Sequence, residues 1–321
     1  MENTNFRSIK DTCKDFIKKS ESKKFVISYS GGIDSSVLLH VFWEIQKSVD
    51  FNLRAIHINH NILSNSEKIE DHCRSQCNKY SIDFKSYDIQ IDGKSNIEEK
   101  CRILRYHKLS QSTDLDEVII TGHQLDDQIE TFLMRILRGS SLNGLASIRA
   151  RVEINHRVIM RPLLNILREE INKYQKEYSL EVIEDISNRD IKFDRNFIRK
   201  KIIPVMKDRW KNLDKSISNN ISIINVQLSI LDDYILKYTK NFYLNDKENE
   251  LNINNLKLES DKMMILIIHK WVSMFNNTNL NMRQIKEIIK IIYTNNDSNP
   301  LFEFNNIKIM KKDKKLMICD K

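Results

Sequence analysis

The stretch FVISYSGGIDSSVLLHVF, residues 25–42, decides the fold. Its first part, Phe25–Tyr29, is a short apolar run rich in β-forming residues and predicts a strand. Its last part, Ser36–Phe42, is apolar and predicts a helix. The loop between them, Ser30–Ser35, consists mainly of small residues. Backbone N–H groups at a helix N-terminus in this setting bind phosphate oxygens. The stretch therefore predicts a strand, a phosphate-binding loop and a helix, in that order.

The residues of this loop suit a phosphate ligand. Gly31 and Gly32 lack a Cβ, so the chain can turn sharply and an oxygen atom can approach the backbone closely. Ser30 and Ser35 add hydroxyl donors, and the carboxylate of Asp34 suits a bridging Mg²⁺ ion. The loop has neither the Gly-Lys-Ser/Thr ending of a Walker A motif nor the Gly-x-Gly-x-x-Gly of a dinucleotide-binding turn.

The six residues resemble the Ser-Gly-Gly-x-Asp-Ser signature of the PP-loop ATP pyrophosphatases. Members of that superfamily cleave ATP between the α and β phosphates, adenylate a substrate oxygen and release pyrophosphate. The resemblance implies ATP and Mg²⁺ as cofactors, with the metal at Asp34. The residues expected to hold the nucleotide are Ser30, Gly31, Gly32, Ile33, Asp34, Ser35 and, at the end of the next strand, His57.

Short β-rich runs alternate with longer helical stretches over the first 137 residues. We expect strands over 25–29, 53–59, 84–91 and 117–121, and helices over 9–19, 36–46, 64–80, 96–110 and 124–137. This alternation predicts an α/β fold in which helices cover both faces of a parallel sheet. Ligands of such sheets bind at the carboxyl ends of the strands, where polar clusters occur at 30–35, 57–61 and 122–127.

The pattern changes after Gly139. Residues 149–164 predict a β-hairpin or an extended connector, and a basic helix over 193–203 ends before Pro204. The remainder is mostly helical, with asparagine-rich loops at 245–256 and 276–281 and short strands at 301–304, 308–310 and 316–318. We therefore expect a parallel-sheet PP-loop catalytic domain over 1–210 and a smaller, mainly α-helical domain over 211–321.

Composition limits the environment and the partners. No run of about 18 apolar residues is present, and the first ten residues lack a signal-peptide core, so no membrane span or secretion is expected. Five scattered cysteines, an odd number, indicate reduced thiols in the cytoplasm rather than a disulfide scaffold. The net charge of +8 favours a polyanionic partner. A genome biased toward asparagine, isoleucine and lysine would produce the same charge.

Three carboxylates, Asp126, Asp127 and Glu130, fall within one turn at the start of the helix expected over 124–137. Acidic residues suit the positive end of a helix dipole, which accounts for the first two. Their position at the strand ends, facing the phosphate-binding loop, favours a cation site. The cation would be Mg²⁺ or the ammonium group of an amino-acid substrate.

Two arginine clusters have both a structural and a functional interpretation. Arg102 and Arg105 share a helix face, where they either form Glu–Arg pairs on a solvated surface or hold phosphate oxygens. Arg195 and Arg199, with Lys200 adjacent, form a basic face that is either solvated or a nucleic-acid contact. A zinc or iron–sulfur site is not expected, because the chain contains no Cys-x-x-Cys.

The ordered set of motifs resembles the bacterial tRNA(Ile)-lysidine synthetase family over about the first 210 residues. The second histidine that often follows His123 in that family is Gln124 here. The chain also resembles the shorter form of the family, without a further C-terminal domain. The motifs that carry the resemblance are Ser30–Ser35, Ala55–Asn61, Glu99–Tyr106, Gly122–Thr131, Met134–Ser140, Arg161–Leu164, Glu184–Asn188 and Arg195–Arg199.

The resemblance implies a two-step ligation. ATP adenylates the C2 oxygen of the wobble cytidine in the CAU anticodon of tRNA(Ile), and free L-lysine then attacks C2 and displaces AMP. The implied catalytic residues are Asp34, Arg102, Arg105 and His123, with His123 or a carboxylate as the base. Lysine would bind at Asp126, Asp127 and Glu130. The tRNA would contact Arg195, Arg199 and Lys200, assisted by the C-terminal domain.

Three other functions remain open from the residues alone. A cytidine thiolase of the same superfamily usually needs a cysteine pair or an iron–sulfur cluster, and a small-molecule synthetase of the NAD or GMP type has less use for the basic charge. A non-enzymatic RNA-binding protein would not need Asp34. The sequence also leaves a homodimer open.

Overall fold

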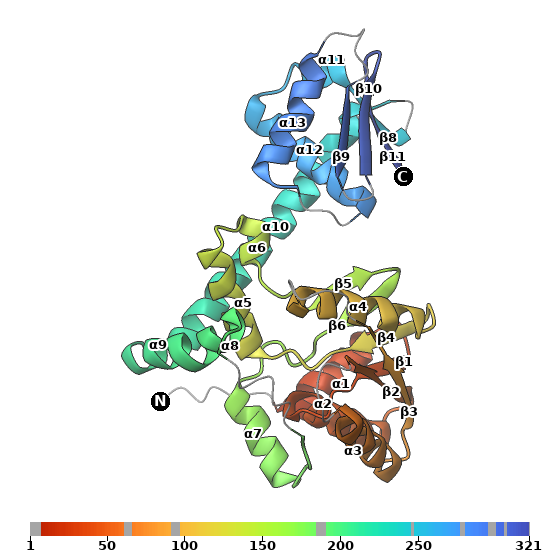
Figure 1. Ribbon diagram of the computed structural model, residues 1–321, viewed down its shortest axis with the longest axis vertical. Coiled ribbons are helices and arrows are strands. Elements are labelled where there is room, and N and C mark those ends of the chain that lie inside the picture. Colours follow the sequence, from red (N-terminus) through yellow and green to blue (C-terminus); the bar gives the residue numbers. More distant parts are fainter. Residues whose placement is uncertain are drawn as a thin grey trace. The chain divides into compact units, whose positions relative to one another are not determined.

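The computed structural model describes residues 8–60, 66–90, 97–183, 191–244, 247–276, 280–294, 300–304 and 307–320 (Figure 1). The Glu184–Asn188 motif and Asn61 lie outside these ranges. The chain divides into two compact units, Met1–Ile224 and Asn225–Lys321. The division falls inside helix α10 (Leu213–Thr239), whereas the sequence placed the domain boundary just before this helix.

The first unit is built on a six-stranded sheet with the order β3-β2-β1-β4-β6-β5. All neighbouring strands run parallel except β5 and β6, which form the antiparallel hairpin expected within 149–164. The sheet confirms the α/β prediction. Its strands are β1 (Lys24–Ser28), β2 (Asn52–Asn59), β3 (Asp83–Asp88), β4 (Glu117–Ile120), β5 (Arg151–Ile154) and β6 (Arg157–Met160).

Alternating side chains of the sheet bury two separate apolar faces. Phe25, Ile27 and Ile120 pack in a core with α1, α2, α3 and α7, while Val26 and Ile119 pack on the other face with α4. The helices of this unit are α1 (Ile9–Lys19), α2 (Ile33–Gln46), α3 (Ser66–Lys79), α4 (Ile97–Gln111), α5 (Leu125–Leu137), α6 (Leu142–Leu145), α7 (Arg168–Glu177), α8 (Asp194–Phe197) and α9 (Ile203–Arg209).

The predicted basic helix forms as a continuous segment with a π-helical turn in its centre. This turn, Ile198–Ile202, joins α8 to α9, and Ile198 is buried. Pro204 lies in the first turn of α9 rather than after the helix. The expectation that proline stops the helix was wrong at this position, because a proline is tolerated in the first turn of a helical segment, where its missing N–H needs no partner within that segment.

The second unit contains an antiparallel sheet of order β7-β8-β11-β10-β9 with helices α11 (Ile253–Leu256), α12 (Asp261–Asn276) and α13 (Met282–Tyr293). The three closing strands were predicted. The loop expected over 245–256 was wrong, because Leu251 is fully buried in β8 and the side chain of Asn252 caps α11. The strands are β7 (Tyr243–Leu244), β8 (Lys247–Asn252), β9 (Leu301–Phe304), β10 (Ile307–Lys312) and β11 (Lys315–Asp320).

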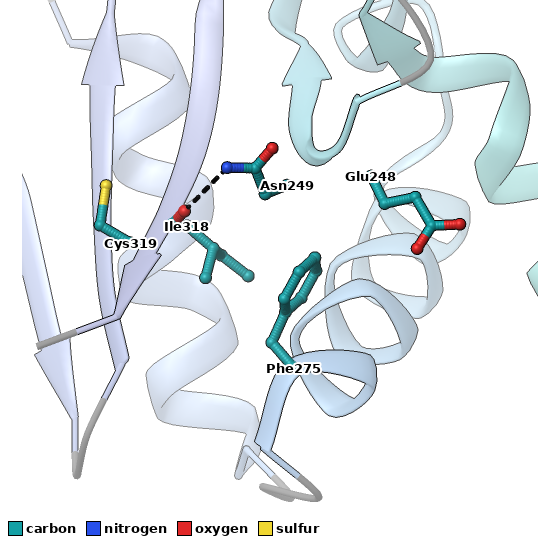
Figure 2. Close-up of a pocket in the computed structure, with 5 residues that line it drawn as sticks. All are labelled: Glu248, Asn249, Phe275, Ile318 and Cys319. Carbon is teal, nitrogen blue, oxygen red and sulfur yellow. Dashed lines mark hydrogen bonds between the residues drawn. The ribbon is translucent and has the colours of Figure 1, made fainter.

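The core of the second unit is apolar and centres on Trp271, whose indole N–H donates to the carbonyl of Glu248 at 2.7 Å. Near it lies a pocket of about 430 Å³ (Figure 2). Figure 2 shows Phe275 and Ile318 at its centre, with the Asn249 amide donating to the Ile318 carbonyl at 3.4 Å. The lining residues include one carboxylate and no cationic side chain. Within the described ranges, no helix is both long and apolar enough to cross a membrane.

Candidate active site

The phosphate-binding loop adopts a conformation that requires glycine. Gly31 has a φ of +76°, and a Cβ at this position would lie 2.8 Å from Cγ2 of Ile183. Its carbonyl accepts the backbone N–H of Ile183 at 3.0 Å. A side chain here would therefore strain the backbone and separate these two segments.

The hydroxyl groups of the loop hold its turn. Oγ of Ser35 donates to the carbonyl of Gly32 at 2.9 Å and accepts the backbone N–H of Ser30 at 3.3 Å. Gly32 is the N-cap of α2 and, having no side chain, cannot cap the helix through one. The first N–H groups of a helix lack partners within the helix, and the dipole of a 14-residue helix favours an anion at this end. The loop therefore fits the phosphates of ATP.

Asp34 lies in the first turn of α2 and pairs with Arg168, at the start of α7, at 2.5 Å. Burial raises the pKa of the Asp34 carboxyl, and so does Asp127, against the opposing effects of Arg168 and Arg199. The side chain is 29% exposed. Among the described residues, no three His, Cys, Asp or Glu side chains are grouped to hold a metal ion. A Mg²⁺ ion at Asp34 would thus depend on phosphate oxygens and water for its other ligands, as is usual for this ion.

Gly122 holds the turn after β4 directly against the phosphate-binding loop. A Cβ on Gly122 would lie 3.1 Å from the backbone C of Asp34 and from the backbone N of Ser35. The close approach brings the start of α5 beside the start of α2. The sequence placed Gly122 in a polar cluster but did not predict this contact, which depends on the order of the strands.

The acidic residues of α5 form one ion-pair network with two arginines, Arg195 of α8 and Arg199 of the π-helical turn that follows it. Glu130 is fully buried, and its two carboxylate oxygens accept hydrogen bonds from Arg195 at 2.7 Å and Arg199 at 2.5 Å. Asp127 pairs with the same two arginines, at 2.9 and 3.4 Å. Its other oxygen accepts the backbone N–H of Gln124 in a capping box.

This network changes two assignments made from the sequence. Asp127 and Glu130 were assigned to lysine, and Arg195 and Arg199 to tRNA, as if the two sets were independent. The structure joins them, so neither carboxylate is open and neither guanidinium is free to face a distant phosphate. The sequence analysis missed the pairing because the partners are 65 to 72 residues apart.

Asp126 and Lys200 lie at the margins of this network. Asp126 pairs with Lys207 at 3.6 Å, and Lys207 also pairs with Asp214 at 2.8 Å. Burial raises the pKa of the Asp126 carboxyl. Lys200, on the π-helical turn, is exposed. Of the residues predicted to hold tRNA, Lys200 has the exposure that a phosphate contact needs.

His123 lies between the strand ends and a group of arginines. Its Nδ1 atom is 2.8 Å from the hydroxyl of Thr121 and accepts a hydrogen bond from Nε of Arg161 at 3.4 Å. Burial lowers the pKa of His123 to about 3, with further lowering by four nearby guanidinium groups. A neutral ring with this pKa is a weak base. The four arginines are Arg161, Arg195, Arg105 and Arg102.

The arginines of α4 are exposed toward this region. Arg102 forms an ion pair with Glu99, three residues earlier, through two hydrogen bonds. This is the Glu–Arg pair that the structural interpretation of the cluster predicts. Arg105 contacts Nε2 of His60 at 2.7 Å. Burial and the Arg105 charge lower the pKa of His60 to about 4. The charges of both arginines also lower the pKa of His123.

His57 supports the phosphate-binding loop from β2. Its Nδ1 donates to the carbonyl of Tyr29 at 2.9 Å, immediately before the loop, and Sγ of Cys73 lies 3.9 Å from the same atom. Burial lowers the pKa of His57 and raises that of the Cys73 thiol. Cys73 and Cys77 are buried.

Residues 5–206 match the family model of the PP-loop domain. The chain is 37% identical to the tRNA(Ile)-lysidine synthase of Buchnera aphidicola subsp. Baizongia pistaciae, over 93% of this chain and 68% of the relative. It is also 37% identical to the enzyme of that name from Wigglesworthia glossinidia brevipalpis, over 94% of this chain and 78% of the relative. The chain belongs to the tRNA(Ile)-lysidine synthase family.

One solved structure has a fold similar to that of this member of the lysidine synthase family. The U34-tRNA thiolase NcsA from Methanococcus maripaludis, solved with its [4Fe-4S] cluster, matches with a TM-score of 0.57 and 19% identity, covering 68% of this chain and 78% of the thiolase. This likeness concerns the fold alone.

Proposed function

We propose that the chain ligates lysine to C2 of the wobble cytidine in the CAU anticodon of tRNA(Ile), using ATP. One observation carries the proposal: the phosphate-binding loop, the buried network of α5 and α8, and the arginines around His123 meet at the carboxyl edge of one sheet. Membership in the family supports the choice of substrates. The place proposed for each reaction step is inferred from the residues of the site.

The first step is adenylation of the base. The cytidine O2 atom attacks the α phosphorus of ATP, a P–O bond forms, and the bond from Pα to the bridging oxygen breaks so that pyrophosphate leaves with the electron pair. The N-terminus of α2 and the hydroxyls of Ser30 and Ser35 would hold the phosphates. Mg²⁺ at Asp34 would neutralise the charge of the departing pyrophosphate. Arg168 would leave Asp34 when the metal binds and could then meet a phosphate oxygen.

The second step transfers lysine. Its ε-nitrogen attacks C2, the C2–O bond breaks, and AMP leaves with the electron pair, while the nitrogen releases a proton. Arg102 and Arg105 would hold the AMP phosphate. Lysine would enter the acidic site by displacing an arginine. Its ammonium group would take the place of the Arg199 guanidinium beside the Asp127 carboxylate. This contact is the longest of the network, at 3.4 Å, and Arg199 is the more exposed arginine, at 39% against 27%.

The RNA would reach the site from the exposed face of the π-helical turn. The wobble base lies in a single-stranded loop and can turn outward without breaking base pairs. Lys200 would contact an anticodon-stem phosphate, while Arg195 holds Glu130 rather than the RNA. This division follows from the exposure of Lys200 and the burial of the network.

Lysine transfer tests the proposal. The full chain is incubated with ATP, Mg²⁺, radiolabelled lysine and tRNA(Ile) bearing CAU, and label in the RNA is counted. We expect transfer with lysine and not with other labelled amino acids, and none to the CAU anticodon of tRNA(Met). Absence of label under conditions where the protein is folded would overturn the proposal, as would equal transfer of other amino acids.

A further inference from the structure

Arg161, the residue after β6, is a buried cation whose three nitrogen atoms each donate a hydrogen bond. It is 8% exposed. Its Nη1 donates to the carbonyl of Arg149 at 2.6 Å, and its Nη2 donates to the hydroxyl of Tyr106 at 3.1 Å. Its Nε donates to Nδ1 of His123 at 3.4 Å. The guanidinium plane is thus fixed by three different segments of the chain.

These bonds determine where the proton of His123 lies. A guanidinium group can only donate, so Nδ1 of His123 must be an acceptor and carries no proton. The hydroxyl of Thr121, at 2.8 Å from the same atom, must then donate as well. A neutral imidazole carries one N–H, which is therefore on Nε2. Among the described residues, no hydrogen bond to Nε2 is present.

The surroundings of the ring favour an anionic ligand. Arg102 and Arg105 of α4 and Arg195 of α8 act on it in addition to Arg161, while Tyr106 and Thr121 contribute neutral hydroxyls. Arg195 is paired with the buried carboxylate Glu130, and Arg102 is paired with the exposed carboxylate Glu99. A donor N–H placed among cations is suited to a phosphate oxygen.

We propose that Arg161 is a positioning residue, which fixes the Nε2–H tautomer of His123 so that this N–H donates to a phosphate oxygen of the nucleotide. His123 is then a hydrogen-bond donor in both steps and not the base that takes the lysine proton. The inference rests on the proposed function for the identity of the nucleotide. The assignment of the tautomer does not, since it depends only on the free protein.

The tautomer is measured directly in the free, full-length protein. Long-range proton–nitrogen NMR of a sample labelled with ¹⁵N-histidine distinguishes Nδ1–H from Nε2–H, and the His123→Gln spectrum identifies the resonance. We expect an Nε2–H imidazole that remains neutral down to about pH 5, well below the ordinary histidine pKa of about 6.5. An Nδ1–H tautomer, or titration near pH 6.5, overturns the proposal whether or not any variant folds.

Kinetics of Arg161→Met test the consequence for catalysis. Without the arginine, Nδ1 can take the proton and donate to Thr121, so Nε2 becomes an acceptor facing the phosphate. We expect kcat for AMP formation to fall by about tenfold or more, with KM for ATP changed less. The deficit should persist from about pH 8 to about pH 6, because burial still holds the pKa of the ring below this range. A purely structural role would instead lower kcat and raise KM for ATP together.

Two further variants complete the test. Arg161→Lys keeps a donor and should recover part of the activity. Arg157→Gln, at the start of β6, should match the wild type, because within the described part of the chain Arg157 donates only to backbone carbonyls. A wild-type protein with the Nε2–H tautomer and no lysine transfer would refute the proposed function alone. An active wild type in which Arg161→Met folds and keeps full activity would refute the role of Arg161 alone.

Discussion

The sheet of the first unit carries a buried ion-pair group at each end, and the two groups differ. At the amino ends of the strands, Arg54 of β2 pairs with Glu117 of β4 through Nε at 2.6 Å and Nη2 at 2.5 Å. At the carboxyl ends, two arginines share two carboxylates, Asp127 and Glu130. Both groups consist of arginine and carboxylate side chains, but these side chains differ in their other neighbours.

The pair at the amino ends is closed. Arg54 also donates to the carbonyl of Ser112, and Glu117 also accepts the backbone N–H of Asp114. Its neighbours are backbone groups that cannot be exchanged for a substrate. The network at the carboxyl ends borders Asp34, whose pKa responds to Asp127 and Arg199. The difference indicates that burial of an ion pair does not by itself identify a functional site. Proximity of the ion pair to the helix N-terminus that would hold phosphate is the feature that distinguishes the proposed site.

Asp34→Asn should give the largest change in activity. It removes the carboxylate proposed to hold Mg²⁺ while keeping the shape of the side chain. We expect AMP formation to fall by at least about a thousandfold, the scale of losing a metal-supported transition-state contact. Rates are measured by release of labelled AMP. Glu44→Gln, on the same helix, should keep wild-type activity, because the partners of Glu44 in the described ranges are Lys10 and Lys47, which lie outside the proposed site. Activity of Asp34→Asn within tenfold of the wild type would remove this residue from the mechanism.

Glu130→Gln should affect both folding and activity. Removing the fully buried charge leaves Arg195 and Arg199 without their main partner, and breaking a buried pair in this way costs about 3–5 kcal/mol. Urea unfolding measures the loss. Lysine transfer should also fall by more than tenfold in the protein that remains folded, because Asp127 would then hold both arginines. Stability equal to that of the wild type would show that the network is not formed in solution.

Glu117→Gln should affect folding alone. Burial opposes ionisation of Glu117, but hydrogen bonds from Arg54 and from the N–H of Asp114 outweigh it and hold the carboxyl pKa below its usual value. A depressed carboxyl pKa stabilises the fold above the unfolded pKa, near 4.3, and this contribution is lost as the pH falls through the folded pKa.

We therefore expect Glu117→Gln to lose up to about 3 kcal/mol at neutral pH. The difference from the wild type should become smaller as the pH falls below the unfolded pKa of about 4.3 and through the depressed folded pKa of Glu117, because the wild type then loses the charge as well. The rate of lysine transfer per folded molecule should be unchanged. A specific loss of activity would contradict the distinction between the two ends of the sheet.

Lys200→Gln should give the smallest effect. Loss of one exposed phosphate contact should weaken tRNA binding by a few fold and reduce the slope of log K against log salt by about 1. Lys18→Gln, an exposed lysine in the last turn of α1, is the matched control and should leave both quantities unchanged. An unchanged salt slope for Lys200→Gln would exclude the π-helical turn from the RNA interface.

Local sequence predicted the elements of the fold well. The six residues at 30–35, between an apolar run and a helical run, fixed the loop, and the alternation of runs predicted the parallel sheet that forms. Composition misled where the side chain has a specific local role. Asn252 reads as a loop residue by type, yet its amide oxygen caps α11 immediately after a buried strand.

The partners within the site were less accessible to sequence reasoning. Asp34 and Arg168 are 134 residues apart, and the pairing of α5 with α8 spans 65 or more. Spacing along the chain shows which residues share one face of a helix. It does not show which other helix packs against that face at the edge of the sheet. Arg161 lies in one of the sequence motifs, but the sequence predicted no role for it, because its role depends on the geometry of His123.

The stoichiometry of the reaction tests the central claim most directly. The full chain is given ATP labelled in the α phosphate, lysine carrying a second label, and tRNA(Ile) with CAU, and the labelled nucleotide released is compared with the lysine bound to RNA. The account predicts one AMP for each lysine transferred, and neither product without Asp34. Release of ADP, or AMP formed in full with no lysine in the RNA, would contradict it.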